Sequence, residues 1–373
     1  MLALLAPLAS GDELAPGVTL VGVSTEVGFW LTLALPEGVL SVEIAPLGEG
    51  KYATRTARHG ISYRAEGGRN PIDPGRGRAL CQLVAAHVAR NEAQVSPIVI
   101  AEHDAARVRE VRVTELLEAA GQGAERFLKL SPYAGCLIGC RYCYAQRPMA
   151  TLRRMEGLPE VPWGSYVDVR INAPEVLARE LDRLEPVPLK FCPILSDPYQ
   201  AVEARYGLTR ACLQQIAAAR SVWPTLLLTR SKLVTRDVDL LASLPAVWVG
   251  ASIPTIEDEV RAHFEPRAAS IEERLASLAV LRRAGVRTFA VVQPLLPGSV
   301  EALADALAAT VSSVSIDVLR GEERATEDFD DARYRESRAE AWQAERASAL
   351  AAALAARSVP VWAGELPPEQ VGR

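Results

Sequence analysis

The chain lacks the features that mark membrane and secreted proteins. Its opening apolar run, residues 1–10, is far shorter than the roughly 20 residues that a membrane-spanning helix needs. The same residues also lack the basic segment with which a secretory signal begins. We therefore expect a mature, cytoplasmic N-terminus and no membrane partner.

A charge excess of one sign is absent as well. The formal net charge is −5 over 373 residues, and most of it comes from residues 321–373, which hold eleven acidic and seven basic side chains. The rest of the chain is close to neutral. Charge alone therefore implies neither a polyanion-binding surface nor a patch for membrane lipids.

Histidine and cysteine are scarce, which limits the metal sites that the chain can build. The four histidines, His59, His87, His103 and His263, are scattered and form no pair with metal-ligand spacing. Six cysteines do not look like a disulfide framework in a chain of this length, so a reducing compartment fits better. Three of the six lie close together, between residues 136 and 143.

Residues 1–120 have the pattern of a small α+β domain. β-rich runs occur at 18–23, 29–35 and 39–44, and an amphipathic helix is expected over 79–91. Residues 121–123, Gly-Gln-Gly, are the expected link to the next domain. The role of this domain is open, and recruitment of a substrate is our hypothesis for it.

Residues 126–320 alternate short apolar runs with helical patterns, which predicts a parallel sheet with right-handed crossovers. The expected strands are 127–131, 189–195, 225–229, 246–252, 287–294 and 311–318. Six βα units suit a partial (β/α)6 barrel, because a full eightfold barrel typically needs about 250 residues. Residues 321–373 are expected to be an acidic C-terminal helical extension, with a helix over 332–357.

The clustered cysteines, Cys136, Cys140 and Cys143, have the spacing C-x3-C-x2-C in a loop after the first of these strands. Three thiolates can hold three irons of a [4Fe–4S] cubane and leave the fourth iron open to S-adenosylmethionine (SAM). Gly135 and Gly139 allow the backbone to turn tightly there. The alternatives are three unrelated buried cysteines or a zinc knuckle, but structural zinc takes four ligands in paired spacing, and no second pair lies nearby.

The cysteine loop resembles that of the radical SAM superfamily, and the wider pattern resembles its spore photoproduct lyase-like (SplB-like) branch. The resemblance covers about residues 126–320. It rests on the run from Ser131 to Ala145, on Ser196-Asp-Pro-Tyr-Gln200 with Glu203, and on the segments 208–210, 229–237, 264–267 and 294–298. It is specific for the cofactors, a [4Fe–4S] cluster and SAM, and not for the substrate.

The resemblance implies a set of SAM contacts. Tyr142 is expected near the adenine, and Ser196 and Asp197 near the ammonium group. Arg230 is expected at the carboxylate, where the branch usually has lysine. An arginine can make a bidentate contact there that a lysine cannot. Ser252 is expected near the ribose or the methionyl end. The alternative for Ser196 and Asp197 is a plain turn or helix cap, and the alternative for Arg230 is an exposed arginine.

Cys192 is the candidate catalytic residue. In the spore enzymes that this chain resembles, a cysteine on the same strand donates a hydrogen atom to the product radical. That cysteine lies three residues before the aspartate, whereas Cys192 lies five before Asp197. Positions two apart share a face of a strand, so Cys192 could still face the barrel interior. The alternative is a small buried hydrophobic residue.

We expect an enzyme that cleaves SAM reductively to a 5′-deoxyadenosyl radical and abstracts hydrogen from a small molecule or peptide, with an external electron donor such as flavodoxin or ferredoxin. No cysteine follows Cys212, so a domain with auxiliary clusters is not expected. Two alternatives are a DNA photolesion lyase, which needs a phosphate-binding surface, and a non-catalytic iron–sulfur electron-transfer or binding protein. Retained SAM cleavage would exclude the last.

Overall fold

The computed structural model of the chain describes residues 2–24, 29–46, 52–57, 59–66, 72–92, 98–103, 108–191, 195–318 and 326–368. The chain folds into two compact units. The barrel unit comprises Val99–Tyr144 and Pro162–Arg373, and the smaller unit comprises Met1–Ile98 and Ala145–Val161. The smaller unit therefore includes a segment from the middle of the sequence, which the expected boundaries assigned to the barrel.

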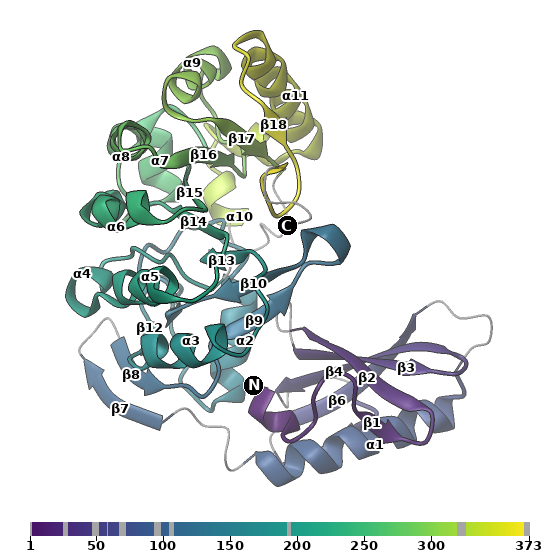
Figure 1. Cartoon of the computed structure of the whole chain (residues 1–373). Helices are drawn as coiled ribbons and strands as arrows, with labels where there is room; N and C mark the ends of the chain where they lie inside the picture. The colour runs from purple at the N-terminus through teal and green to yellow at the C-terminus, as the bar shows by residue number, and fades with distance from the viewer. Residues whose placement is uncertain are drawn as a thin grey trace. The chain divides into compact units, whose positions relative to one another are not determined.

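An eight-stranded sheet forms the centre of the barrel unit (Figure 1). Its spatial order is β18-β17-β16-β15-β14-β13-β10-β9, and the neighbours from β10 to β17 pair in parallel. The parallel strands are β10 (Phe127–Leu130), β13 (Leu189–Phe191), β14 (Thr225–Thr229), β15 (Val247–Ser252), β16 (Arg287–Val292) and β17 (Ser313–Ile316). The prediction of a partial barrel with six parallel strands is confirmed.

Helices cover one face of this sheet. The helices whose residues join the apolar clusters against the sheet are α3 (Ala173–Leu181), α5 (Leu208–Ala218), α6 (Val238–Ser243), α8 (Ile271–Arg283), α9 (Val300–Thr310) and α11 (Glu340–Ala356). Leu177 of α3 and Leu213 of α5 share an apolar cluster with Leu189 of β13. Leu303 of α9 packs with Val314 of β17 in a second cluster. The helix-facing side of the sheet is thus the apolar core of the unit.

The opposite, inner face of the sheet follows from the alternation of side chains along a strand. Because Leu128 and Leu130 belong to the helix-covered core, Phe127 must point inward. An apolar layer at the first residues of the strands packs with the C-terminal segment and consists of Phe127, Leu226, Trp248, Phe289, Trp362 and Leu366. This layer fills the N-terminal end of the barrel.

Polar residues occupy the inward positions at the other end of the strands. A residue four positions after a member of the apolar layer lies on the same face of the sheet, because side chains alternate between the two faces. These positions are Ser131, Arg230, Ser252 and Gln293. The barrel interior is therefore apolar at its N-terminal end and polar at its C-terminal end, where the sites of such barrels lie.

The boundary expected near residue 120 is wrong. The strand β9 (Leu117–Ala120) pairs antiparallel with β10, so that Ala120 lies opposite Phe127. Gly121 and Gly123 have positive φ angles of 70° and 56° and make the turn of this hairpin instead of a link between domains. A four-stranded sheet also joins earlier residues to the barrel unit, with the strands β7 (Ile98–His103), β8 (Val108–Arg112), β11 (Tyr133–Ala134) and β12 (Val167–Arg170).

The C-terminal segment is built into the barrel unit and does not form a separate extension. Leu354 of α11 packs in the same cluster as Leu307 of α9. The strand β18 (Val361–Trp362) adds to the parallel sheet beside β17. The helix expected over 332–357 begins only at Glu340, because Ala339 is extended, with φ −67° and ψ 133°.

The smaller unit is an antiparallel sheet with a long helix, as the α+β pattern predicts. Its strands are β1 (Glu13–Ala15), β2 (Val18–Ser24), β3 (Phe29–Leu35), β4 (Gly38–Pro46), β5 (Thr54–Arg55) and β6 (His59–Glu66). The helix α1 (Pro74–Asn91) packs against the sheet and begins earlier than expected, because Asp73 caps it with a 2.9 Å hydrogen bond from the Arg76 backbone. The helix α2 (Gln146–Met155) brings Met155 into the same core.

None of the helices in the described part of the chain is long and apolar enough to cross a bilayer.

We predict that Trp362→Ala destabilises the barrel unit by about 3–5 kcal/mol, the usual cost of truncating a buried aromatic side chain. The Trp362 ring lies 6.1 Å from the Phe289 ring, and its Nε1 donates to Ser313 Oγ at 3.2 Å. Urea unfolding followed by circular dichroism measures the loss. Val361→Ala is the matched control, because Val361 is 40% exposed. Equal losses in the two variants would contradict the packing described.

Candidate active site

The cysteine loop emerges at the C-terminal end of β10, the polar end of the barrel. Cys136 and Cys140 are buried, and Cys143 is half-buried. The backbone N–H of Cys143 donates to the carbonyl of Cys140 at 3.2 Å, which makes a tight turn between the last two cysteines. The loop therefore presents the three sulfur atoms from one short segment.

Two backbone hydrogen bonds tie the loop to other parts of the barrel. Gly135 N donates to Leu195 O at 3.0 Å, beyond the end of β13. Arg141 N donates to Phe264 O at 2.8 Å, at the end of α7 (Asp258–Phe264). Gly139 has φ +64°, and a Cβ there would lie 2.4 Å from Nη2 of Arg267. The loop is thus fixed from both sides, with an arginine packed against its middle.

The buried thiols of Cys136 and Cys140 lie in surroundings that oppose their ionisation unless a cation binds them. Burial and the charge of Asp197 raise the pKa of Cys136 to about 12, although backbone hydrogen bonds from Ile138 and Asp197 lower it. Burial also raises the pKa of Cys140 well above its usual value, against the opposing charge of Arg230. Metal bonding is what turns such buried thiols into thiolates.

The three cysteines of the loop are the type of donor that holds iron–sulfur clusters. Among the described residues, no three His, Cys, Asp or Glu side chains come together as ligands of one metal ion. A cubane needs no such convergence, because each thiolate binds a different iron. Cys81 and Cys212, the other cysteines that the structure describes, are buried in the apolar cores of the smaller unit and the barrel unit.

Asp197 follows β13 by six residues and is buried. Its carboxylate accepts hydrogen bonds from Thr229 Oγ1 at 2.7 Å, Arg230 N at 2.7 Å and Tyr199 N at 2.9 Å. These bonds join the ends of β13 and β14 and fix the backbone of Arg230. Ser196, beside Asp197, is also buried.

Glu265 is the centre of a buried ionic network that the sequence patterns did not predict. Its carboxylate accepts from Tyr142 Oη, from Arg230 Nε at 2.8 Å and from a terminal nitrogen of Arg274. Glu265 and Arg274 are 0% and 1% exposed, and a second terminal nitrogen of Arg274 donates to Ser252 O at 2.7 Å. Burial opposes ionisation of Glu265, but Arg274 and Arg230 outweigh it and hold its pKa below the usual range. Only the segment 264–267, singled out by the resemblance, hinted at this role.

Two inward-facing hydroxyl groups at the polar end of the barrel have no hydrogen-bond partner among the described residues. They belong to Ser131, after β10, and to Ser252, the last residue of β15, which are 5% and 0% exposed. Native proteins rarely leave buried polar groups unpaired. Such groups fit a site whose ligand completes them.

The structure describes Gln293 and His263, two polar residues of the barrel unit, but not the predicted catalytic residue Cys192. Gln293 follows β16, where its Nε2 donates to Asp317 Oδ2 at 3.2 Å. His263 packs against the rings of Phe264 and Tyr334, at centroid distances of 4.8 and 4.7 Å. Cys192 lies outside the described residues, so its role stays a prediction.

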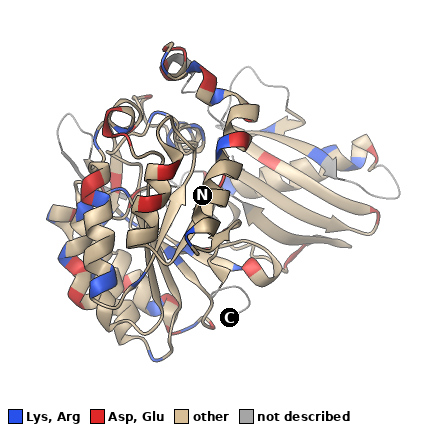
Figure 2. Cartoon of the chain, turned by 90° about the horizontal axis from the view of Figure 1, so that it is seen from above, with Lys and Arg blue, Asp and Glu red and all other residues tan. Residues whose placement is uncertain are grey.

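The basic residues in the middle of the sequence are largely neutralised. Arg236 pairs with Glu203 at 2.6 Å and with Asp237 at 2.8 Å, and Arg210 pairs with Asp237 at 2.9 Å. Glu203 and Asp237 are fully buried. Lys232 likewise pairs with Glu273 at 2.5 Å. Basic and acidic residues are interspersed over the helices (Figure 2), and each of these arginines and this lysine is paired with a carboxylate.

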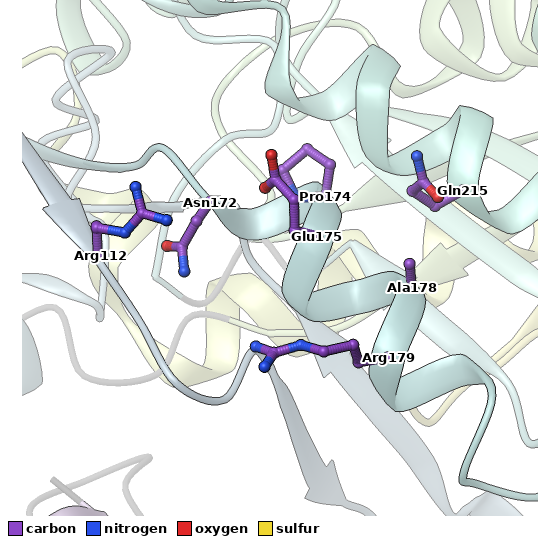
Figure 3. Close-up of a pocket in the computed structure, with 7 residues that line it drawn as sticks. All are labelled: Arg112, Asn172, Pro174, Glu175, Ala178, Arg179 and Gln215. Atoms are coloured by element: carbon purple, nitrogen blue, oxygen red, sulfur yellow. The ribbon is translucent and has the colours of Figure 1, made fainter.

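None of the residues predicted for the site lines an open pocket of about 600 Å³ that is drawn in Figure 3. Residues of β8, α3 and α5 and the cap of α3 line it: Arg112, Asn172, Pro174, Glu175, Ala178, Arg179 and Gln215. The side chain of Asn172 is already bonded to both backbone groups of Val113, at 2.9 and 2.8 Å. We assign this pocket no catalytic role.

The family model described as "Radical SAM superfamily" matches residues 130–329 of the chain. A mutant spore photoproduct lyase of known structure is 17% identical, with a TM-score of 0.50 over 71% of this chain and 87% of that one. This likeness shows a shared fold. The predicted superfamily is confirmed, and so is the likeness to the spore photoproduct lyase-like branch.

Curated relatives match this chain over about 170 residues. An uncharacterized protein of Methanocaldococcus jannaschii is 28% identical over 46% of this chain and 61% of its own length. An uncharacterized protein of Mycobacterium tuberculosis is 33% identical, with shares of 44% and 48%. A protein of Pseudomonas phage M6 named radical SAM Nα-GlyT isomerase is 27% identical, with shares of 45% and 33%. The chain spans about half the length of the curated relatives it matches.

We predict that Glu265→Gln destabilises the barrel unit by about 3–5 kcal/mol, because it leaves Arg230 and Arg274 buried without their counter-charge. Chemical denaturation of the metal-free protein measures the change. Glu259→Gln is the control: Glu259 pairs with Arg333 at 3.2 Å, but its side chain is 85% exposed, so the loss should stay below about 1 kcal/mol. A similar, small loss in both variants would show that the buried network does not hold the site together.

Proposed function

The chain belongs to the radical SAM superfamily, and we propose that it abstracts hydrogen from a small-molecule or peptide substrate at the C-terminal end of its barrel. Members of this superfamily are enzymes that use a [4Fe–4S] cluster and SAM, so the chain needs a reductant as well as a substrate. When bound, the cluster and SAM supply a 5′-deoxyadenosyl radical that takes a hydrogen atom from the substrate. The observation that carries the proposal is the convergence of the cysteine loop, Arg230 and the unpaired serine hydroxyls at one end of the barrel.

We assign the cluster to Cys136, Cys140 and Cys143. Support comes from their shared loop, the burial of Cys136 and Cys140, and the backbone hydrogen bonds that Cys136 receives from Ile138 and Asp197. Hydrogen bonds of this kind stabilise thiolate sulfur. The aromatic residues Phe264, Phe329 and Tyr334 pack in the same cluster as Cys136 and Cys140, and they exclude water from that side of the loop.

Arg230 is assigned to the SAM carboxylate. Arg230 donates to Glu265 only through its Nε. The two terminal nitrogens of Arg230 therefore have no hydrogen bond among the described residues. The Arg230 side chain is 16% exposed, which leaves these nitrogens accessible to a ligand. A guanidinium fixed at Nε can still make a bidentate contact with a carboxylate.

The other SAM contacts follow from the same network. Tyr142 has its hydroxyl committed to Glu265, so its ring is the part that remains for the adenine. The free hydroxyl of Ser252 suits the ribose or the methionyl end. Ser196 and Asp197 suit the ammonium group, although Asp197 already accepts three hydrogen bonds from its own chain.

A compact substrate is favoured over duplex DNA, because Arg210, Arg236 and Lys232 are paired with carboxylates. We propose that Gln293 and Asp317 lie on the substrate side of the barrel mouth. Both stand at inward-facing positions just after their strands, β16 and β17, and are half-exposed. We also propose that the smaller unit helps to recruit the substrate, since its helix α2 begins three residues after Cys143 in the sequence.

We predict that the anaerobically reconstituted protein, given a reductant and SAM, forms 5′-deoxyadenosine, and that Cys140→Ala abolishes this activity because one iron ligand is lost. Liquid chromatography of the quenched reaction measures the nucleoside. Cys81→Ala is the matched control, because Cys81 is equally buried but lies in the core of the smaller unit. No deoxyadenosine from the cluster-loaded wild type under any reductant would refute the proposed activity.

We predict that Arg230→Met weakens SAM binding to the cluster-loaded protein by about 10- to 100-fold, as expected for the loss of charged hydrogen bonds worth about 1.5–3 kcal/mol. Arg230→Lys should retain part of the affinity, because the charge remains. Equilibrium dialysis with labelled SAM measures the dissociation constants. Arg333→Met, which removes a 57% exposed arginine, is the control. Unchanged affinity in Arg230→Met would remove Arg230 from the SAM site.

A further inference from the structure

The side chain of Gln200 forms a three-way clamp on the cysteine loop. It is 1% exposed and follows β13 by nine residues. Its Oε1 accepts from Leu137 N at 2.8 Å, and its Nε2 donates to Gly135 O at 3.1 Å and to Ser196 Oγ. The three partners are two backbone groups of the cysteine loop and the hydroxyl of Ser196. The amide makes a hydrogen bond with each donor hydrogen and with its oxygen.

The partners of Gln200 bracket one cluster cysteine. Gly135 and Leu137 are the residues immediately before and after Cys136. One amide therefore holds the backbone on both sides of that sulfur. Its third partner, Ser196, precedes Asp197, and the backbone of Asp197 hydrogen-bonds to the sulfur of Cys136. Gln200 thus links the cysteine loop to the segment that supplies Ser196 and Asp197.

An amide is required at this position because the partners have mixed polarity. Leu137 N–H needs an acceptor, whereas the Gly135 carbonyl needs a donor. A carboxylate of the same shape could serve Leu137 but would repel the carbonyl oxygen. An aliphatic side chain would leave both backbone groups buried and unpaired, at about 1–3 kcal/mol each.

We propose that Gln200 is a positioning residue that fixes Cys136 for cluster binding and couples the loop to Ser196 at the SAM site. The proposal rests on the function proposed above. In metal sites, partners that orient the ligands typically change metal affinity by about 10- to 100-fold when they are replaced. Gln200 acts through the backbone of the loop and touches neither cluster nor substrate in this scheme.

The chain offers a matched control in Gln343 of α11. This glutamine is also 1% exposed, and its Nε2 donates to two backbone carbonyls, Leu295 O at 2.8 Å and Ser337 O at 2.6 Å. Neither partner belongs to the cysteine loop. Replacing Gln343 therefore removes a similarly buried amide without disturbing Cys136.

The test compares wild type, Gln200→Glu, Gln200→Leu and Gln343→Leu as full-length proteins, reconstituted anaerobically. Three quantities are measured: iron and sulfide per chain under limiting iron, the electron paramagnetic resonance spectrum of the reduced cluster with and without SAM, and the melting temperature. Both Gln200 variants should need about tenfold more iron for half-loading, and their spectra should lose the change that SAM produces in the wild type. Gln343→Leu should lower the melting temperature only.

Each outcome has a distinct meaning. A wild type that binds no cluster overturns the proposed function itself, and the role of Gln200 with it. If the wild type loads normally, and the Gln200 variants load and respond to SAM as Gln343→Leu does, then only the positioning role is overturned. If Gln200→Leu does not fold, the isosteric Gln200→Glu decides, because it removes the donor and leaves the packing unchanged.

Discussion

One buried carboxylate, that of Glu265, holds together the parts of the barrel that surround the cysteine loop. It receives hydrogen bonds from Tyr142 in the loop, from Arg230 after β14 and from Arg274 in α8. A charge buried to this degree is stable only while all its partners stay in place. The loop, the strand end and the helix must therefore adopt one mutual arrangement. In that arrangement the charge of Arg230 acts on Cys140 and opposes the rise that burial causes in its pKa.

The need of a buried charge for partners also explains a second network, which involves other residues of the family pattern. Glu203 and Asp237 are fully buried, and Arg236 bridges them. Tyr133, two residues before Gly135, donates its hydroxyl to Glu203. This second network supports the strand ends from the helix-covered side, as Glu265 does from the cysteine loop. Residues that looked like basic surface in the sequence are thus part of the scaffold.

The division of the barrel interior into two layers suits radical chemistry. Aromatic residues such as Trp248 and Phe289 close the N-terminal end together with Trp362 from the C-terminal segment. Four residues further along the strands, polar groups such as Ser252 and Gln293 take the inward positions. A reactive species formed at the polar end, where we propose the site, would have an apolar, water-free layer on one side, which protects it from side reactions with water. The period-two alternation of strands produces both layers at once.

The cysteine spacing and the six βα units were readable from the sequence, because a local loop and local periodicity encode them. The hairpin that joins β9 to β10 was not, because glycines in a turn and in a link look alike until strands pair. Tertiary structure alone also decided the partners of Glu265 and Gln200. Tyr142 and Glu265 are 123 residues apart, and Leu137 and Gln200 are 63 apart. Single-residue chemistry shows that a buried charge or amide needs partners, but only the folded chain brings them within bonding distance.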